Sequence, residues 1–218
     1  MQARHKEILS RYFPAGVVEQ VADIIVKNRI QLRFTAGRNT KLGDYRPPGS
    51  KVSAHRITLN GNLNPWFLYL VFIHEYAHLL VWNKYQNRVS PHGQQWKEEF
   101  ASLLRQQLYQ NSLPESIARQ VLDFCKNPRA TFASHAPLWK ALKTFDAPND
   151  NEVLVADLPV NAYFVAANGK IFQKEERVKT RYRCYCVNNK RRYLFHPMAG
   201  VQPLEGEHVL QQALQTSP

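Results

Sequence analysis

The sequence is poor in cysteine, because Cys125, Cys184 and Cys186 are the only three in 218 residues. An odd number of thiols in a chain of this length excludes a disulfide-stapled scaffold and favours a reducing cytosol. Acidic residues are also scarce: 17 Asp and Glu stand against 29 Lys and Arg, which gives a net charge of +12. This imbalance does not specify a fold. It favours polyanionic partners such as nucleic acid, and less so an anionic membrane surface.

The hydrophobic pattern predicts neither a signal peptide nor a membrane span. The N-terminal residues lack an apolar segment of signal-peptide length. The longest apolar stretch, residues 66–82, contains His74, Glu75 and His78, and charge is expensive inside a bilayer. Asn64-Pro65 ahead of it is typical of the first residues of a soluble helix. We therefore expect a soluble, cytoplasmic monomer, nucleoid-associated if bacterial, that does not contact membranes.

Periodicity predicts a helix-rich domain with a small sheet over residues 1–148. Short alternating segments at 30–34 and 55–60 are typical of strands. The intervening stretch, 36–50, is rich in Gly, Pro and polar residues and predicts a loop or a ragged hairpin.

The pattern changes at the linker-like run 146–151. Beyond it, short alternating segments predict strands, and Asn168-Gly169 between two of them is a strong hairpin signal. Residues 149–218 are therefore predicted to form a small, basic, all-β module. The fold class that we expect for the whole chain is α+β.

An HExxH pattern, residues 74–78, lies inside the long predicted helix. Residues four apart share one helix face, so His74 and His78 can bind one tetrahedral Zn²⁺ while Glu75 deprotonates the bound water. A catalytic zinc keeps one position open and needs a third protein ligand. His92, at the start of the next predicted helix, is the candidate. The alternative is a set of satisfied core histidines, but burying these groups unpaired on an apolar helix would be costly.

This motif, followed by Pro91-His92-Gly93-Gln94-Gln95-Trp96, resembles the SprT-like zinc metallopeptidase domain, which includes the Spartan DNA–protein crosslink proteases. Residues 41–45 and 57–60 are similar to the family's Leu-Gly and Ile-x-Leu-Asn segments. The resemblance covers about residues 5–110. It implies a zincin-like metallopeptidase domain and one catalytic Zn²⁺.

The resemblance also implies roles for particular residues. His74, His78 and His92 would be the zinc ligands, and Glu75 the general base. The strand at 55–60 would lie beside the cleft, where it could pair with an extended peptide substrate.

The chain departs from many bacterial relatives, which end in a zinc ribbon with two Cys-x-x-Cys pairs. Only Cys184 and Cys186 occur in this part of the chain. We expect cysteines separated by one residue to point to opposite faces of a strand, and therefore not to share a metal. Free thiols are predicted, and the alternative is a vestigial site assisted by His196 or His208.

The C-terminal module is strongly basic, with nine Lys or Arg and two Glu between residues 170 and 192, and aromatic residues interleave with them. Alternation predicts Lys179, Arg181 and Arg183 on one strand face. Such a face is typical of modules that hold single-stranded or distorted DNA or RNA. The alternative is a solvated strand face over a small aromatic core. The predicted contacts are Lys179, Arg181, Arg183, Lys190, Arg191 and Arg192.

Two functions remain open at this point. The first hypothesis is a zinc-dependent endopeptidase acting on proteins bound or crosslinked to nucleic acid, with Tyr45 and Arg38 as candidates for stabilising the oxyanion. The second is a non-proteolytic, nucleic-acid-associated regulatory binding protein with a structural or idle zinc site. Glu75 argues against the second, because a structural site needs no base and is usually closed by four protein ligands.

Overall fold

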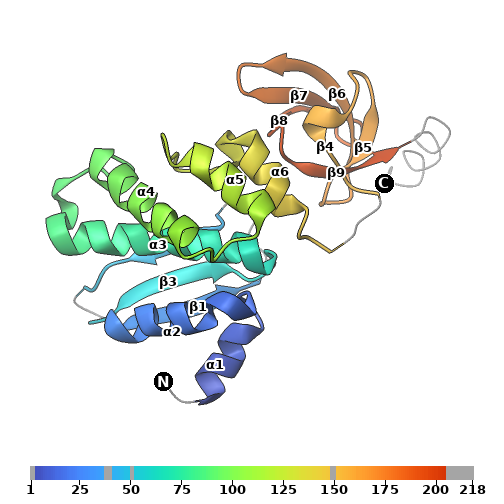
Figure 1. The fold of residues 1–218 in the computed structure, drawn as a ribbon. Coiled ribbons are helices and arrows are strands. Elements are labelled where there is room, and N and C mark those ends of the chain that lie inside the picture. The colour runs from blue at the N-terminus through green and yellow to red at the C-terminus, as the bar shows by residue number, and fades with distance from the viewer. Residues whose placement is uncertain (1–2, 37–40, 50–51, 148–150, 205–218) are drawn as a thin grey trace. The chain divides into compact units, whose positions relative to one another are not determined.

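The computed structural model describes residues 3–36, 41–49, 52–147 and 151–204. The chain divides into two units, Met1–Ala147 and Pro148–Pro218, which we call the N-terminal domain and the β module (Figure 1). Among the described helices, none is both long and apolar enough to cross a membrane. Two residues named above, Arg38 and His208, lie outside the described part of the chain.

Helices and a small sheet make up the N-terminal domain, and the predicted α+β class is confirmed. A strand occupies part of the stretch for which a loop or ragged hairpin was predicted. In chain order the elements are α1 (Ala3–Ser10), η1 (Ala15–Val17), α2 (Val18–Lys27), β1 (Ile30–Thr35), β2 (Gly43–Arg46), β3 (His55–Asn60), α3 (Pro65–Tyr85), η2 (Gln86–Arg88), α4 (Gln94–Tyr109), α5 (Glu115–Phe124), η3 (Phe132–Ser134) and α6 (Ala136–Lys143).

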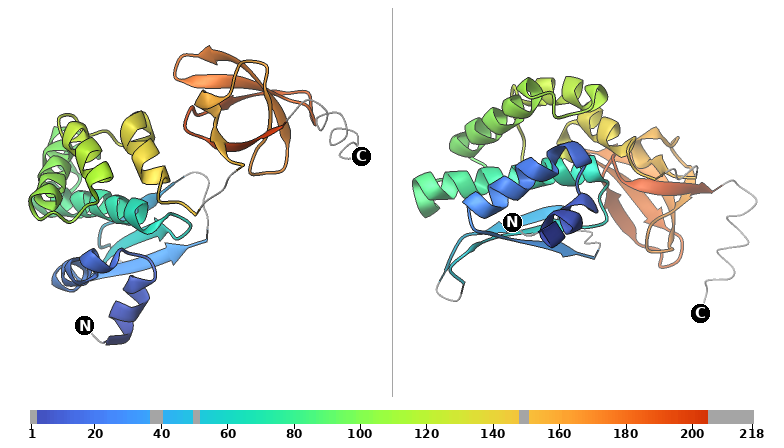
Figure 2. Two further views of the ribbon diagram at one scale, coloured as in Figure 1. Left: turned by 45° about the vertical axis from the view of Figure 1, so that its right-hand side comes forward. Right: turned by 60° about the horizontal axis from the view of Figure 1, so that its bottom comes forward.

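The sheet has the order β1-β3-β2, with β3 parallel to β1 and antiparallel to β2. Helix α2 covers one face and α3 the other (Figures 1 and 2). Ile57 and Leu59 of β3 are fully buried between these layers. The expectation that the 55–60 strand would receive a peptide is wrong, because β3 has a neighbour on each side. In the described sheet, β1 and β2 are the edge strands, and β2 is the one that packs against α3.

Helix α3 is apolar around its whole circumference, which is typical of a helix buried on all sides. It begins as predicted: Pro65 is its first residue and Asn64 is its N-cap, whose Oδ1 accepts a hydrogen bond from the Phe67 N–H at 2.9 Å. The Asn64 amide also donates to the Leu142 carbonyl at 2.9 Å and to Asp146 Oδ1 at 2.6 Å. One side chain therefore joins the start of α3 to the end of α6.

An aromatic cluster fixes the connection between α5 and α6 against α3. The ring of Phe132 in η3 lies 5.8 Å from Phe67 of α3, 6.1 Å from Phe100 of α4 and 5.7 Å from Phe124 of α5. Phe132 is almost completely buried. Because this ring packs against three helices, residues 130 and 131, which precede it, are held beside α3.

The β module is a six-stranded antiparallel sheet with the order β4-β9-β5-β6-β7-β8. The predicted hairpin turn is present between β5 and β6, where Gly169 adopts a φ of +74°. The sheet is strongly curled, since Phe164 of β5 and Phe195 of β8 lie 5.2 Å apart across its concave side. Its elements are β4 (Val153–Leu154), η4 (Val155–Asp157), β5 (Tyr163–Val165), β6 (Ile171–Val178), β7 (Arg181–Cys186), β8 (Arg192–Phe195) and β9 (Gly200–Leu204).

All three cysteines are free and buried, which confirms the predicted thiols. The expectation that Cys184 and Cys186 point to opposite faces is wrong, because both are fully buried in the core of the module. Side chains alternate along a strand, so residues two apart share a face. It is Tyr185, between them, that points the other way.

We predict that Asn64→Ala destabilises the N-terminal domain by about 1–3 kcal/mol, since it removes an N-cap and leaves a buried carbonyl without its donor. The melting temperature of that domain should fall by about 2–4 °C for each kcal/mol. Asn62→Ala is the control, because Asn62 is exposed. Thermal unfolding followed by circular dichroism measures both, and equal effects would contradict the role of Asn64.

Candidate metal centre

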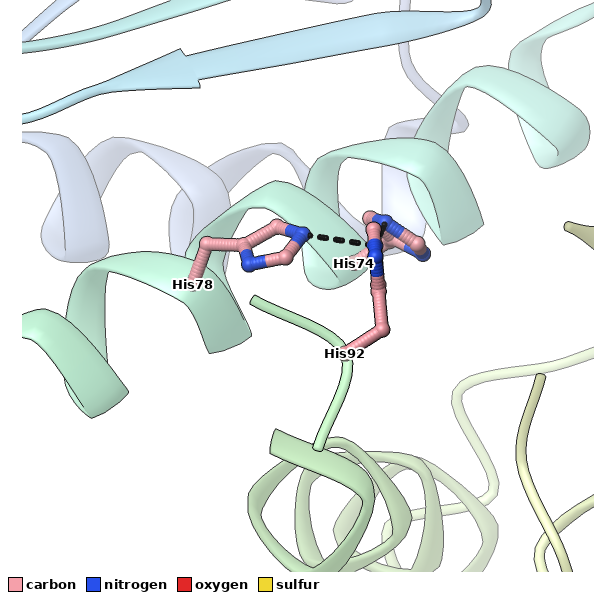
Figure 3. Close-up of side chains that lie close together, drawn as sticks. All are labelled: His74, His78 and His92. Carbon is pink, nitrogen blue, oxygen red and sulfur yellow. Dashed lines mark hydrogen bonds between the residues drawn. The ribbon is translucent and has the colours of Figure 1, made fainter. Parts of the chain in front are cut away.

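Three histidines meet between α3 and the start of α4 (Figure 3). His74 and His78 lie one turn apart on α3, and His92 lies just ahead of α4. The Nε2 atom of His92 is 3.1 Å from Nε2 of His78 and 3.4 Å from Nε2 of His74. The structure thus brings together the three histidines that the sequence singled out.

The spacing of these nitrogens fits one bound ion. A tetrahedral metal at about 2.0–2.1 Å from each imidazole nitrogen places the nitrogens about 3.3–3.4 Å from one another. The separations of 3.1 and 3.4 Å are close to that value. Among the described residues, this is the one group of three or more His, Cys, Asp or Glu side chains placed to hold a metal ion.

The surroundings of the three imidazoles keep them neutral. Burial, and then the neighbouring His78 and His92, hold the pKa of His74 well below its usual range. Burial, and then His92, lower the pKa of His78 to about 4, and burial lowers the pKa of His92. A neutral imidazole has a free nitrogen lone pair, which is the form that coordinates metals.

Trp96 of α4 forms the wall behind the histidines. Its ring lies 4.7 Å from His74, 5.3 Å from His78 and 4.8 Å from His92, and the residue is completely buried. Its indole Nε1 has no hydrogen-bond partner among the described residues. Trp96 therefore acts here through the size of its ring, whose contacts restrict the rotation of the three imidazoles.

Glu75 lies next to the histidines and packs against strand β2. It is largely buried and lines the same cavity as the three histidines. A Cβ atom at Gly43 of β2 would lie only 2.5 Å from Oε1 of Glu75. Close approach of a side chain to a backbone is a common reason for glycine. The Leu-Gly segment was noticed in the sequence, but nothing local indicates that its glycine faces the glutamate.

The cavity has a volume of about 780 Å³ and is lined by β2, α3, the connection from α3 to α4, and residues 130–132. Tyr45, one of the two oxyanion candidates, lies in its lining. The Tyr45 ring is parallel to that of His78 at 6.4 Å, and its hydroxyl is hydrogen-bonded to Nδ1 of His55 at 2.9 Å. Burial raises the pKa of Tyr45, so the hydroxyl keeps its proton. Sequence reasoning missed residues 130–132, because only tertiary packing brings them here.

The backbone of β2 presents hydrogen-bonding groups at its outer edge. The Asn60 N–H donates to the Leu42 carbonyl at 2.8 Å, which places Leu42 in a hydrogen-bonded pair with β3. Hydrogen-bonded and non-hydrogen-bonded pairs alternate along an antiparallel ladder. Asp44, two residues after Leu42, therefore also directs its N–H and C=O groups toward β3. Gly43 and Tyr45 therefore direct their N–H and C=O groups away from β3, toward the edge of β2 that pairs with no described strand.

Two of the predicted nucleic-acid contacts are engaged within the β module. Arg183 pairs with Glu175 at 2.9 Å and also with Glu176. Arg192 pairs with the same Glu175 at 3.0 Å. Lys174, counted among the cations of this segment, is only 2% exposed and donates to the Leu158 carbonyl. These residues contribute less free positive charge than the sequence suggests.

The other four predicted contacts are exposed and lie at opposite ends of β7. Lys179 and Arg181 are at the turn from β6 to β7, and Lys190 and Arg191 are at the turn from β7 to β8. Lys179 has a φ of +55°, so it belongs to the turn and not, as predicted, to a strand face shared with Arg181 and Arg183. The basic residues thus form two groups instead of one continuous strip.

Comparison with known proteins identifies the family. The model of the SprT-like family matches residues 3–118. The chain is also 31% identical to "Protein SprT" of Enterobacter sp. (strain 638) over 145 residues, which are 56% of this chain and 87% of that protein. No solved structure matches the chain significantly. The family match covers the sheet, α3, α4 and all three histidines, and the chain belongs to the SprT-like family.

Proposed function

We propose that the protein is a zinc-dependent endopeptidase with a zincin-like N-terminal domain. The observation that carries this proposal is the convergence of three Nε2 atoms beside Glu75 on the wall of one cavity. Three protein ligands leave a fourth tetrahedral position for water or substrate, which is typical of catalytic zinc sites.

The chemistry of the donors supports zinc. Neutral imidazoles suit zinc, and the fit to a tetrahedral ion argues for it among the metals that imidazole binds. When bound, zinc polarises a carbonyl and lowers the pKa of its water. Glu75, on the wall of the same cavity, would accept the proton from this water and pass it to the leaving amine. The protonated hydroxyl of Tyr45 remains the candidate donor to the developing oxyanion.

The free edge of β2 is the proposed place for the substrate backbone. An extended peptide can add to a sheet edge through main-chain hydrogen bonds. The outward-facing N–H and C=O groups of Gly43 and Tyr45 belong to the strand that also packs on Glu75 and His78. A peptide held there would run along the cavity that the histidines line.

The proposed substrates are proteins bound or crosslinked to nucleic acid. The net charge of +12 and the exposed basic groups at both ends of β7 support contact with phosphate backbones. Single-stranded or distorted DNA is the proposed partner. A cytoplasmic location, near the nucleoid in a bacterium, is part of the same proposal and is supported by the free thiols.

The alternative function is a regulatory protein that binds nucleic acid without proteolysis and whose zinc is structural or idle. The cavity beside Glu75 favours the enzyme, because a structural site is usually closed by four protein ligands. Two measurements separate the functions, zinc content and protein cleavage, since the alternative predicts metal binding without any cleavage.

The first prediction concerns the metal. Purified protein should contain one zinc per chain, and His78→Ala or His92→Ala should lose it, because two imidazoles hold the ion weakly. His5→Ala is the control, since His5 is exposed on α1. Elemental analysis measures the content. Normal zinc binding by His92→Ala would show that the ligand assignment is wrong.

The second prediction concerns proton transfer. Glu75→Gln keeps the shape of the side chain and should keep zinc, yet cleavage should fall by about 10²–10⁴-fold, because the proton acceptor is gone. Glu98→Gln on the exposed face of α4 is the matched control. Digestion of casein or histones in the presence of single-stranded DNA is the assay. Cleavage by Glu75→Gln at the wild-type rate would refute the proposed role.

The third prediction concerns the β module. Affinity for single-stranded DNA should fall steeply with salt, and each phosphate contact that is lost should reduce the log–log slope by about 0.7. Lys179→Gln with Arg181→Gln, or Lys190→Gln with Arg191→Gln, should each lower the slope.

The matched comparison is the pair that already engages Glu175. Arg183→Gln with Arg192→Gln should change the slope less, because these side chains have intramodular partners. Fluorescence anisotropy at several salt concentrations measures all three pairs, and zinc content should not change. If neutralising all four exposed residues leaves DNA binding at the wild-type level, the module is not the binding surface.

A further inference from the structure

Gly43 is the point at which β2 meets the proposed general base. A Cβ atom at this position would lie 2.5 Å from Oε1 and 2.9 Å from Cγ of Glu75, and 2.7 Å from Cγ1 of Val71. Non-bonded atoms are in favourable contact at about 3.5–4.0 Å. Gly43 does not have a positive φ. The position therefore requires glycine because of the space, and not because of the backbone conformation.

The two residues of β2 that face α3 differ completely in side-chain size. Gly43 and Tyr45 share a face of the strand. In the register of the sheet, Gly43 pairs with Leu59 of β3 and Tyr45 pairs with Ile57. Tyr45 places a large ring over His78. Two residues earlier, Gly43 has no side chain, and Glu75 fills the space that a side chain would occupy.

The geometry points to Gly43 as the positioning residue of Glu75. The missing side chain lets the carboxylate lie between α3 and β2, inside the cavity and beside the strand edge where a peptide would pair. A methyl group there displaces the carboxylate without removing it. This inference rests on the proposed function, because it takes Glu75 as the base that accepts the proton from the zinc-bound water.

Gly43→Ala tests the assignment directly, with Gly49→Ala as the control, since an added Cβ at Gly49 meets nothing within 4 Å. Alanine keeps the backbone N–H and C=O, so peptide pairing remains and KM should change little. Misplacing a catalytic group by about 1 Å costs about 10²-fold, so kcat should fall by that order while zinc content stays at one per chain. Wild-type kcat in Gly43→Ala would overturn the inference.

The contact with Val71 needs its own control. Val71→Ala removes the clash with Cγ1 and leaves the contact with Glu75. Adding Val71→Ala to Gly43→Ala should therefore leave kcat low. Recovery of kcat in the double variant would show that the damage arises from packing against Val71, and the assignment of Gly43 to Glu75 would fail.

A double-mutant cycle on zinc-free protein gives a readout that does not depend on activity. Overpacking by Gly43→Ala should lower the melting temperature by several degrees in the wild-type background. In the Glu75→Ala background the shift should be clearly smaller, because Cγ and Oε1 are absent. Equal shifts in both backgrounds would overturn the inference. If the wild type cleaves no protein, the proposed function fails, but the cycle still decides whether Gly43 sets the position of Glu75.

Discussion

The burial of α3 on all sides is the constraint on which the rest of the structure depends. The helix carries apolar side chains on all its sides, so the sheet covers one side and α4, η3 and α6 cover the others. The same helix carries His74 and Glu75, which are 8% and 6% exposed. Polar groups at such depth are costly unless they have partners. The fold therefore leaves one cavity beside them, lined by β2 and by residues 130–132.

The electrostatics of the three histidines follow from this depth. Burial disfavours the charged form of each imidazole; the neighbouring His78 and His92 further oppose protonation of His74, and His92 does so for His78. Hydrogen bonds among the three Nε2 atoms satisfy only part of their bonding capacity, because one N–H serves one acceptor at a time. A bound cation satisfies all three at once, which is the physical reason why this arrangement suits a metal better than a packing role.

Strand β2 shows why local patterns predict a site only in part. The stretch around it is rich in Gly and Pro and carries little alternation, so the sequence predicts a loop or a ragged hairpin. In the structure β2 gains its order from pairing with β3, and that pairing brings Gly43 to Glu75 and Tyr45 to His78. The edge proposed for a peptide is therefore that of β2, because β3 lies between β1 and β2.

The sequence by itself determined the α+β class, the start of α3 at Asn64 and Pro65, the turn at Gly169 and the set of three histidines. Each rests on short-range chemistry: a cap, a turn, or two residues one helical turn apart. Only the tertiary structure decided that Glu175 engages Arg183 and Arg192, that residues 130–132 line the cavity, and that Gly43 rests on Glu75. These contacts join residues whose neighbourhood is set by sheet pairing and core packing, and neither is encoded in local periodicity.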